Sequence, residues 1–229
     1  MKHLSLTSSE FERLIKILLW LSGGLWAALF VVQLHVMRAE PLTAAFLSFS
    51  AAVTVAVLLF GLVYKIAWKS ERVARWMRRP IVHGVWRGTL QSNYQRDSDS
   101  PLIVPIVFVI RQTYLTISVQ SFTPSQDGES KLEALVQSEK NDSTLLSYLF
   151  ELQRFSGGEN KLTTGAGQLK LLDDNKLLRG FYWTNSPTRG EARLELVSRD
   201  VDGVNCYEVA EKKWPSMPAT ATDPVQTGP

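Results

Sequence analysis

Residues 17–37 read ILLWLSGGLWAALFVVQLHVM, and residues 42–64 read LTAAFLSFSAAVTVAVLLFGLVY. Neither run contains Asp, Glu, Lys or Arg, and each is long enough to cross a bilayer, which takes about 20 apolar residues in a helix. A cleaved signal peptide is the alternative for the first run, but that run is too long and a second apolar run follows at once. The sequence therefore predicts two transmembrane helices, at 17–37 and 42–64.

The residues that flank the two runs predict their orientation. Only Arg38-Ala39-Glu40-Pro41 joins them, so they form a tight hairpin. Basic residues gather at the opposite ends of the runs, at Arg13, Lys16, Lys65, Lys69, Arg72, Arg75, Arg78 and Arg79. Because basic flanks stay in the cytoplasm, we expect residues 1–16 and everything after the second span to be cytoplasmic. No outside segment is large enough to sense a ligand, so any input comes from the cytosol or the bilayer.

Small residues recur at helical spacing in both runs, at Gly23, Gly24, Ala27 and Ala28 and at Ser48, Ala52 and Ala56. Such faces let membrane helices approach closely. They either pack the hairpin against itself or leave one face for neighbouring chains, which would make a homo-oligomer. The polar residues Gln33 and His35 lie near the outer end of the first run. Without ionisable groups at mid-depth, a transporter is not expected.

The charge of the chain divides between its two parts. The 229 residues carry a net charge of +3, but residues 1–79 hold 10 lysines and arginines against four acidic residues, so the remainder is acidic overall. This distribution does not favour binding of a DNA or RNA polymer by the soluble part. The single cysteine, Cys206, excludes an intramolecular disulfide and a zinc site built on paired cysteines.

Residues 65–82 form a basic juxtamembrane linker, which we expect to continue the second helix until Pro80 ends it. The cluster of lysines and arginines would be attracted to anionic lipids. A simple topology anchor accounts for the same residues and is the preferred interpretation.

From Gly84 onward the hydrophobic pattern alternates, as in Val85 to Gln91, where Trp86, Gly88 and Leu90 share one face. Clusters of Gly, Pro, Asn, Asp and Ser separate eight such segments. The predicted strands are 85–91, 106–111, 113–120, 131–137, 145–153, 167–172, 176–184 and 191–199. This pattern is typical of an antiparallel sandwich or an up-and-down barrel, and the short connections favour a meander that closes into an eight-stranded β-barrel at 83–199. Residues 200–229, with four prolines, are expected to be a disordered tail.

Catalytic motifs are missing from the sequence. His83 is the only histidine in the soluble part, and there is no P-loop or HExxH motif. Asp173-Asp174 is interpreted as a turn. We therefore expect no enzyme, no metal site and no cofactor. The segment from Gly180 to Gly190 gathers instead rings, hydroxyls and a guanidinium, which are groups that stack on bases and pair with phosphate.

The two spans, the basic linker and the β-domain resemble a known family. The motifs that carry the resemblance are Gly84-Val85-Trp86-Arg87-Gly88, Arg111-Gln112-Thr113, Leu146-Ser147-Tyr148-Leu149-Phe150 and Gly180-Phe181-Tyr182-Trp183-Thr184. They are similar to the two-transmembrane, β-strand-rich effectors of bacterial cyclic-oligonucleotide anti-phage (CBASS) systems. The resemblance covers about residues 13–199.

The resemblance implies a defence function at the bacterial inner membrane. The cytoplasmic barrel would bind a cyclic dinucleotide made by a partner nucleotidyltransferase, and the spans would then oligomerise, disrupt the membrane and kill the infected cell (abortive infection). The ligand-binding residues expected are Arg189, Thr188, Tyr182 and Thr184, followed by Trp86 and Tyr148. For each ring, a place in the core is the alternative. A membrane-tethered barrel that binds a small ligand or recruits a protein, without membrane lysis, is the alternative function.

Overall fold

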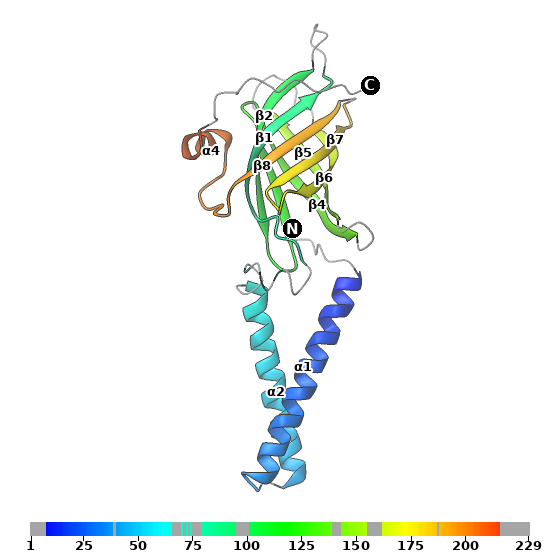
Figure 1. Cartoon of the computed structure of the whole chain (residues 1–229), viewed down its shortest axis with the longest axis vertical. Helices are drawn as coiled ribbons and strands as arrows, with labels where there is room; N and C mark the ends of the chain where they lie inside the picture. The colour runs from blue at the N-terminus through cyan, green and yellow to red at the C-terminus, as the bar shows by residue number, and fades with distance from the viewer. Residues whose placement is uncertain are drawn as a thin grey trace.

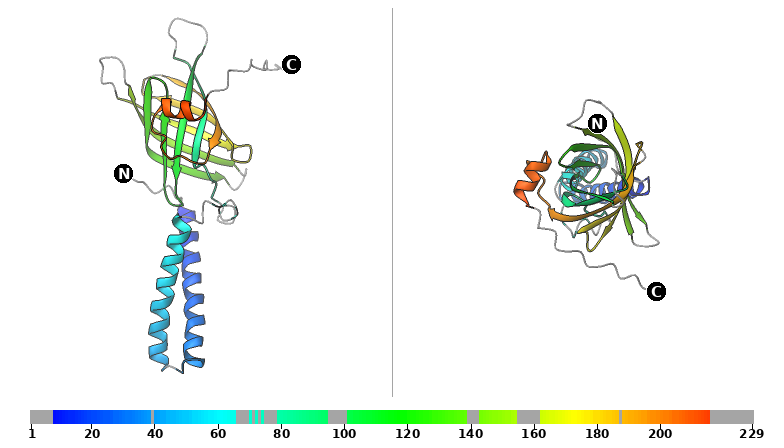
Figure 2. Two further views of the ribbon diagram at one scale, coloured as in Figure 1. Left: turned by 90° about the vertical axis from the view of Figure 1, so that its left-hand side faces the viewer. Right: turned by 90° about the horizontal axis from the view of Figure 1, so that it is seen from above.

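The computed structural model of the chain describes residues 8–38, 40–65, 70, 72, 74, 79–94, 101–138, 143–154, 162–186 and 188–215. Two long helices form a hairpin at one end of the molecule, and a β-barrel lies beyond the open end of the hairpin (Figure 1). A short helix packs on the outside of the barrel (Figure 2). The predicted fold class, a helical hairpin followed by an eight-stranded antiparallel barrel, is confirmed.

The hairpin consists of α1 (Ser8–His35) and α2 (Pro41–Lys65). Both helices are long and apolar enough to cross a membrane, over Phe11–His35 and Pro41–Leu62. α2 therefore contains its predicted span, whereas α1 begins nine residues before the predicted span 17–37 and ends two residues before its last residue. The predicted continuation of α2 towards Pro80 falls mostly outside the described residues.

Only one of the two small-residue faces forms the contact between the helices. Ser48, Ala52 and Ala56 on α2 are fully buried in the hairpin, together with Ala44 one turn earlier. The small residues of α1 have no such role. Gly23, Gly24, Ala27 and Ala28 are exposed, and a Cβ added at either glycine would meet nothing within 4 Å. The small-residue face of α1 is thus left open on the outside of the hairpin.

The barrel is a closed meander in which every strand pairs antiparallel with its neighbours and β1 pairs with β8. The strands are β1 (Gly84–Ser92), β2 (Leu102–Gln112), β3 (Ile117–Phe122), β4 (Gln126–Ser138), β5 (Ser143–Arg154), β6 (Thr163–Leu172), β7 (Leu177–Thr184) and β8 (Arg189–Ser198). All eight predicted strands exist. The largest differences are at the strand starts: β2 and β6 begin four residues earlier than predicted and β4 five residues earlier. β3 begins four residues later, so Tyr114 lies in the connection before it.

The barrel interior differs between its two ends. At the end nearer the hairpin, inward-facing aliphatic side chains such as Ile110, Leu146 and Leu178 are fully buried. We call the opposite end the distal end. There, inward-facing Leu90 and Tyr182 are only partly buried, and each lies two residues before the end of its strand. Solvent therefore reaches the interior from the distal end only as far as these residues.

A second, smaller core covers the outer face of β1, β2 and β3. It consists of Val85, Val107, Val109, Phe122, Val201, Val204 and Ala210. Its C-terminal members belong to the segment after β8, which includes α4 (Tyr207–Lys213). Arg87 on β1 forms an ion pair with Glu211 on α4. Burial and, secondly, the Glu208 carboxylate raise the pKa of Asp127 on β4, because α4 lies close to that strand.

The expectation of a disordered tail is therefore wrong for residues 200–215. Prolines and small polar residues suggested disorder, but apolar residues at Val201, Val204 and Ala210 give this segment a face to bury against the barrel. Residues 216–229 lie outside the described residues.

The linker closes the end of the barrel that faces the hairpin. Val82 is fully buried in the barrel core, and the Gln112 side chain accepts hydrogen bonds from the backbone N–H groups of Val82 and His83 at 2.8 and 3.1 Å. Gln112 also donates to the Pro80 carbonyl at 3.0 Å. Residues 80–83 are thus hydrogen-bonded directly to the barrel wall at Gln112.

Candidate functional site

The strand registers decide which predicted site residues share the barrel interior. Alternation along β7 and β8 places Tyr182 and Thr184 on the inner face with buried Leu178, whereas exposed Arg189 faces outward. Tyr148 also faces inward, opposite Gly167 on β6, and Gly167 is in turn opposite Tyr182. Tyr148 and Tyr182 therefore belong to one interior row, separated by a glycine.

Aromatic rings in this row lie over glycines of the neighbouring strand. A Cβ added at Gly167 would come within 2.5 Å of the Tyr148 ring and hydroxyl. Phe150 covers Gly165 in the same way, and a Cβ added at Gly190 would come within 2.8 Å of the Tyr182 ring. Because these glycines have no side chains, the rings rest against the barrel wall and take up less of its centre.

The rings also contact one another. Phe108 meets Tyr148 edge to face with centroids 5.8 Å apart, and Tyr148 lies 5.6 Å from Phe150. Burial, and secondarily the negative charge of an ionised Tyr182, raises the pKa of Tyr148 well above the ordinary value of 10.0. Tyr148 is therefore neutral at physiological pH and offers one O–H donor inside the barrel.

Two threonines and Arg189 form the rim at the distal end. Thr184 and Thr188 contact each other through their hydroxyls at 2.5 Å, and the Thr184 N–H donates to the Thr188 carbonyl at 2.9 Å. The Arg189 N–H donates to the Asn93 side chain at 2.8 Å, which connects the start of β8 to the residue after β1. Thr184, Thr188 and Arg189 of the predicted site therefore lie together at the distal end of the barrel.

Trp86 is part of the buried core at the end of the barrel nearer the hairpin. Its side chain is 0% exposed, its indole N–H donates to the Val82 carbonyl at 2.8 Å, and the Arg199 guanidinium lies 5.9 Å from its ring centroid. Of the six predicted site residues, Trp86 is thus the one that fills the end of the barrel nearer the hairpin. It joins the linker to the core instead of lining the distal interior.

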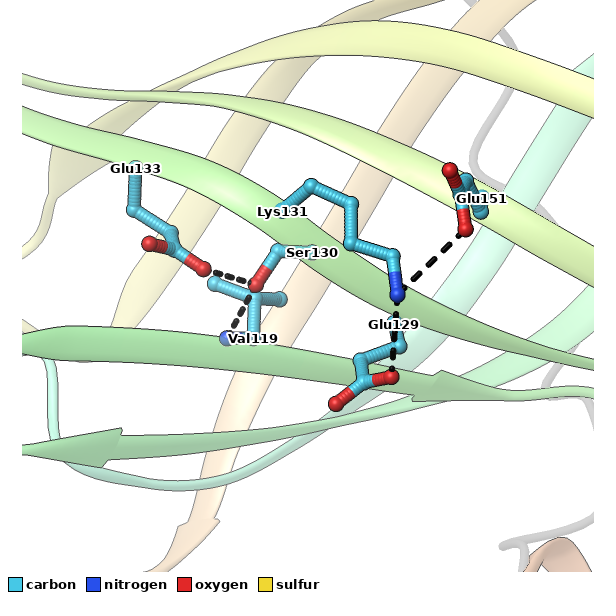
Figure 3. A network of polar contacts seen from close by, with 6 residues as sticks. All are labelled: Val119, Glu129, Ser130, Lys131, Glu133 and Glu151. Atoms are coloured by element: carbon cyan, nitrogen blue, oxygen red, sulfur yellow. Dashed lines mark hydrogen bonds and ion pairs between the residues drawn. The ribbon is translucent and has the colours of Figure 1, made fainter. Parts of the chain in front are cut away.

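Sequence reasoning missed Glu133, a buried carboxylate on the inner face of β4. Glu133 is 5% exposed and is directly opposite Tyr148 on β5. It accepts a hydrogen bond from the Ser130 hydroxyl, which itself accepts one from the Val119 N–H at 2.8 Å (Figure 3). The signal in the sequence was a glutamate in an apolar strand, but its face depends on a β-bulge that alternation does not reveal.

The described residues contain no group of three His, Cys, Asp or Glu side chains that could hold a metal ion. From the middle of the barrel to its distal end, the interior holds aromatic rings, hydroxyl groups and one carboxylate. These groups can stack on a planar ligand and hydrogen-bond its edge, with a guanidinium available at the rim.

Comparison with known protein families finds no matching family, and comparison with curated protein sequences finds no match either.

Proposed function

We propose that the protein is a ligand-gated membrane effector of the type found in bacterial cyclic-oligonucleotide anti-phage (CBASS) systems. The observation that carries this proposal is the asymmetry of the barrel interior. Its end near the hairpin is filled with aliphatic side chains, whereas towards the distal end Tyr148, Phe150 and Tyr182 are set against glycines, and Tyr182 is only partly buried. A planar ligand that enters from the cytosol would meet the partly buried Tyr182 ring first.

The proposed ligand is a cyclic dinucleotide from a partner nucleotidyltransferase. Aromatic faces of Tyr148 and Tyr182 suit base stacking, which is worth about 1–3 kcal/mol per base. The hydroxyls of Thr184 and Thr188 can bond to sugars or base edges at the rim. Arg189 projects outward at the same rim, where its side chain can turn over the edge and pair with a phosphate.

The proposed output is self-association of the helices in the bacterial inner membrane, with both termini and the barrel in the cytoplasm. The exposed face of Gly23, Gly24, Ala27 and Ala28 supports this step, because small residues allow close contact with a second hairpin. The linker bonds at Gln112 supply the connection between the barrel and α2. The protein then acts as a homo-oligomeric, non-enzymatic effector that disrupts the membrane and causes abortive infection.

The test is a thermal-shift and leakage experiment on the full chain. Thermal unfolding in detergent with a panel of cyclic di- and trinucleotides should reveal one selective stabiliser, because a ligand at 100 times its dissociation constant adds about 2.7 kcal/mol. That ligand should release dye from proteoliposomes, and Arg189→Ala should weaken its binding. A complete panel without a stabiliser would contradict the proposal.

A second candidate function is recruitment of a protein partner by a tethered barrel that does not disrupt the membrane. Cross-strand neighbours Leu132 and Leu149 on the outer face are about half exposed, and Ala166 connects them to exposed Trp183. Such an apolar row suits a protein contact. Leakage from liposomes that contain only the purified chain and its ligand would favour the effector, whereas toxicity in cells without leakage, lost on Leu149→Lys, would favour recruitment.

A further inference from the structure

The β-bulge in β4 brings a carboxylate into the barrel in place of aliphatic side chains. The register with β5 shifts between Ser130 and Leu132, and beyond this shift Glu133 and Leu135 face inward. Leu132 and Val136 consequently face outward, 51% and 42% exposed. Without the bulge, the ordinary alternation would bury these two aliphatic side chains and expose the glutamate. A strand that departs from its hydrophobic pattern in this way suggests a functional position.

The described residues give the Glu133 carboxylate one hydrogen-bond donor. In the described part of the chain, Ser130 is the only residue that donates a hydrogen bond to Glu133, and no described cation forms an ion pair with it. The Val119 N–H donates to the Ser130 oxygen, so the serine proton is directed at the carboxylate. A carboxylate can accept several hydrogen bonds, so Glu133 can still accept bonds from another group.

Lys131, the lysine nearest to Glu133 in the sequence, forms its ion pairs on the opposite face of the sheet. Lys131 is on the outer face, where it pairs with Glu129 at 3.4 Å and with Glu151 at 3.3 Å (Figure 3). The bulge therefore places Glu129 and Glu133, both on β4, on opposite faces of the sheet. The outer carboxylates are paired with a lysine and exposed, and the inner one remains available to whatever enters the barrel.

We propose that Glu133 reads the base of the bound nucleotide and selects guanine. This inference rests on the proposed function, since it assumes that a cyclic dinucleotide enters the barrel. An ionised carboxylate only accepts hydrogen bonds. Guanine presents two adjacent donors on its pairing edge, the N1–H and the exocyclic amine, which match the two oxygens of Glu133. Adenine presents a ring acceptor beside its amine, and that acceptor would face the carboxylate.

The same charge fixes the orientation of the ligand. A phosphate beside Glu133 would be repelled at close range, so the base points inward and the phosphates point to the rim that carries Arg189. Tyr148, directly opposite Glu133, then lies beside the same base. Glu133 on β4 would thus bond to the edge of the base, and Tyr148 on β5 would contact its face.

The experiment is titration calorimetry on the full chain in detergent micelles, with cyclic di-GMP and cyclic di-AMP as probes. We expect the wild type to bind cyclic di-GMP more tightly, and Glu133→Gln to weaken that binding on the order of 10- to 100-fold, since a bidentate contact discriminates bases by about 1–3 kcal/mol. Binding of cyclic di-AMP should stay the same or become tighter, because the glutamine amide can donate to the adenine ring acceptor that the carboxylate only repels.

The matched control is Glu151→Gln, the same chemical change on the outer face of the neighbouring strand. This variant should bind both probes like the wild type. Unfolding of the ligand-free chain shows whether the variants fold. Glu133→Gln should melt at about the same temperature as the wild type, because the amide oxygen of glutamine can accept the same hydrogen bond from Ser130.

Each outcome has a distinct meaning. Equal binding of cyclic di-GMP by Glu133→Gln and the wild type would overturn the role of Glu133 and leave the proposed function standing. Preference of the wild type for cyclic di-AMP would do the same. If the folded wild type binds no cyclic dinucleotide at all, both the proposed function and this inference are wrong.

Discussion

Tyr148 lies over Gly167, the residue directly opposite it on β6, and its ring occupies the space that a side chain at Gly167 would fill. The two neighbouring glycines of the distal interior, Gly165 and Gly190, have the same relationship to Phe150 and Tyr182. The glycines therefore set the positions of three rings, which makes them part of the proposed site although they offer no functional group of their own.

Gly167→Ala should displace the Tyr148 ring. The added Cβ would be 2.5 Å from the ring and hydroxyl, so the ring must move towards the centre of the barrel. We expect a loss of about 1–3 kcal/mol in the free energy of unfolding, as for other overpacked cores, together with weaker ligand binding. Denaturant unfolding and calorimetry measure the two effects.

The control for this prediction is a double-mutant cycle with Tyr148→Ala. Once the ring is absent, Gly167→Ala has no ring to displace and should have little further effect on stability. Strictly additive effects would contradict a direct clash between the two residues.

Alkaline pH should destabilise the barrel through Tyr148. Its pKa is raised in the folded state above the ordinary value of 10.0, chiefly by burial, so above pH 10 the unfolded state loses this proton first. The contribution to stability is complete below that pH and is lost as the pH rises towards the folded pKa. Thermal unfolding on either side of pH 10 should show a steeper fall for the wild type than for Tyr148→Phe. Identical pH profiles would mean that the tyrosine ionises freely.

Arg87→Ala should release α4 from the barrel wall. The Arg87–Glu211 pair is largely buried on the arginine side, and its loss should cost about 1–2 kcal/mol, as for hydrogen bonds between charged groups that are partly shielded from water. Limited proteolysis should then cut residues 200–215 faster. Lys213→Ala, which removes a more exposed pair with Asp200, is the matched control and should change little.

The order and number of strands could be predicted because the barrel has one apolar and one solvated face. Alternation at Trp86, Gly88 and Leu90 places the inner face of β1 correctly. The two helices were equally predictable, since length and lack of charge define a candidate span. In both cases the pattern repeats over many residues, so single exceptions do not obscure it.

Neither the bulge in β4 nor the docking of α4 could be predicted, and each has a physical reason. A single extra residue near Ser130 inverts the inner and outer faces of the rest of β4, and nothing in the local composition marks it. α4 docks on an apolar patch around Val107 and Val109 on the outer face of β2. This patch forms only when β2 takes its place in the folded barrel. The run Ile106–Ile110, buried on both faces, was the available signal for a covering segment.

The two small-residue faces of the hairpin should respond differently to substitution. Ala52→Leu on α2 places a large side chain in the contact between α1 and α2, where the alanine is 1% exposed, so the hairpin should separate and the protein should lose stability. Gly24→Leu on α1 meets no neighbour within the hairpin, so the fold should persist.

If the open face of α1 joins neighbouring hairpins, Gly24→Leu should abolish ligand-induced oligomers and dye leakage while ligand binding to the barrel stays unchanged. Cross-linking in proteoliposomes with added ligand measures the oligomers. Val31→Leu, an exposed position on the same helix that already carries a branched apolar side chain, controls for side-chain bulk and should leak dye like the wild type. Full leakage by Gly24→Leu would show that the face opened by the hairpin is not the surface through which the chains associate.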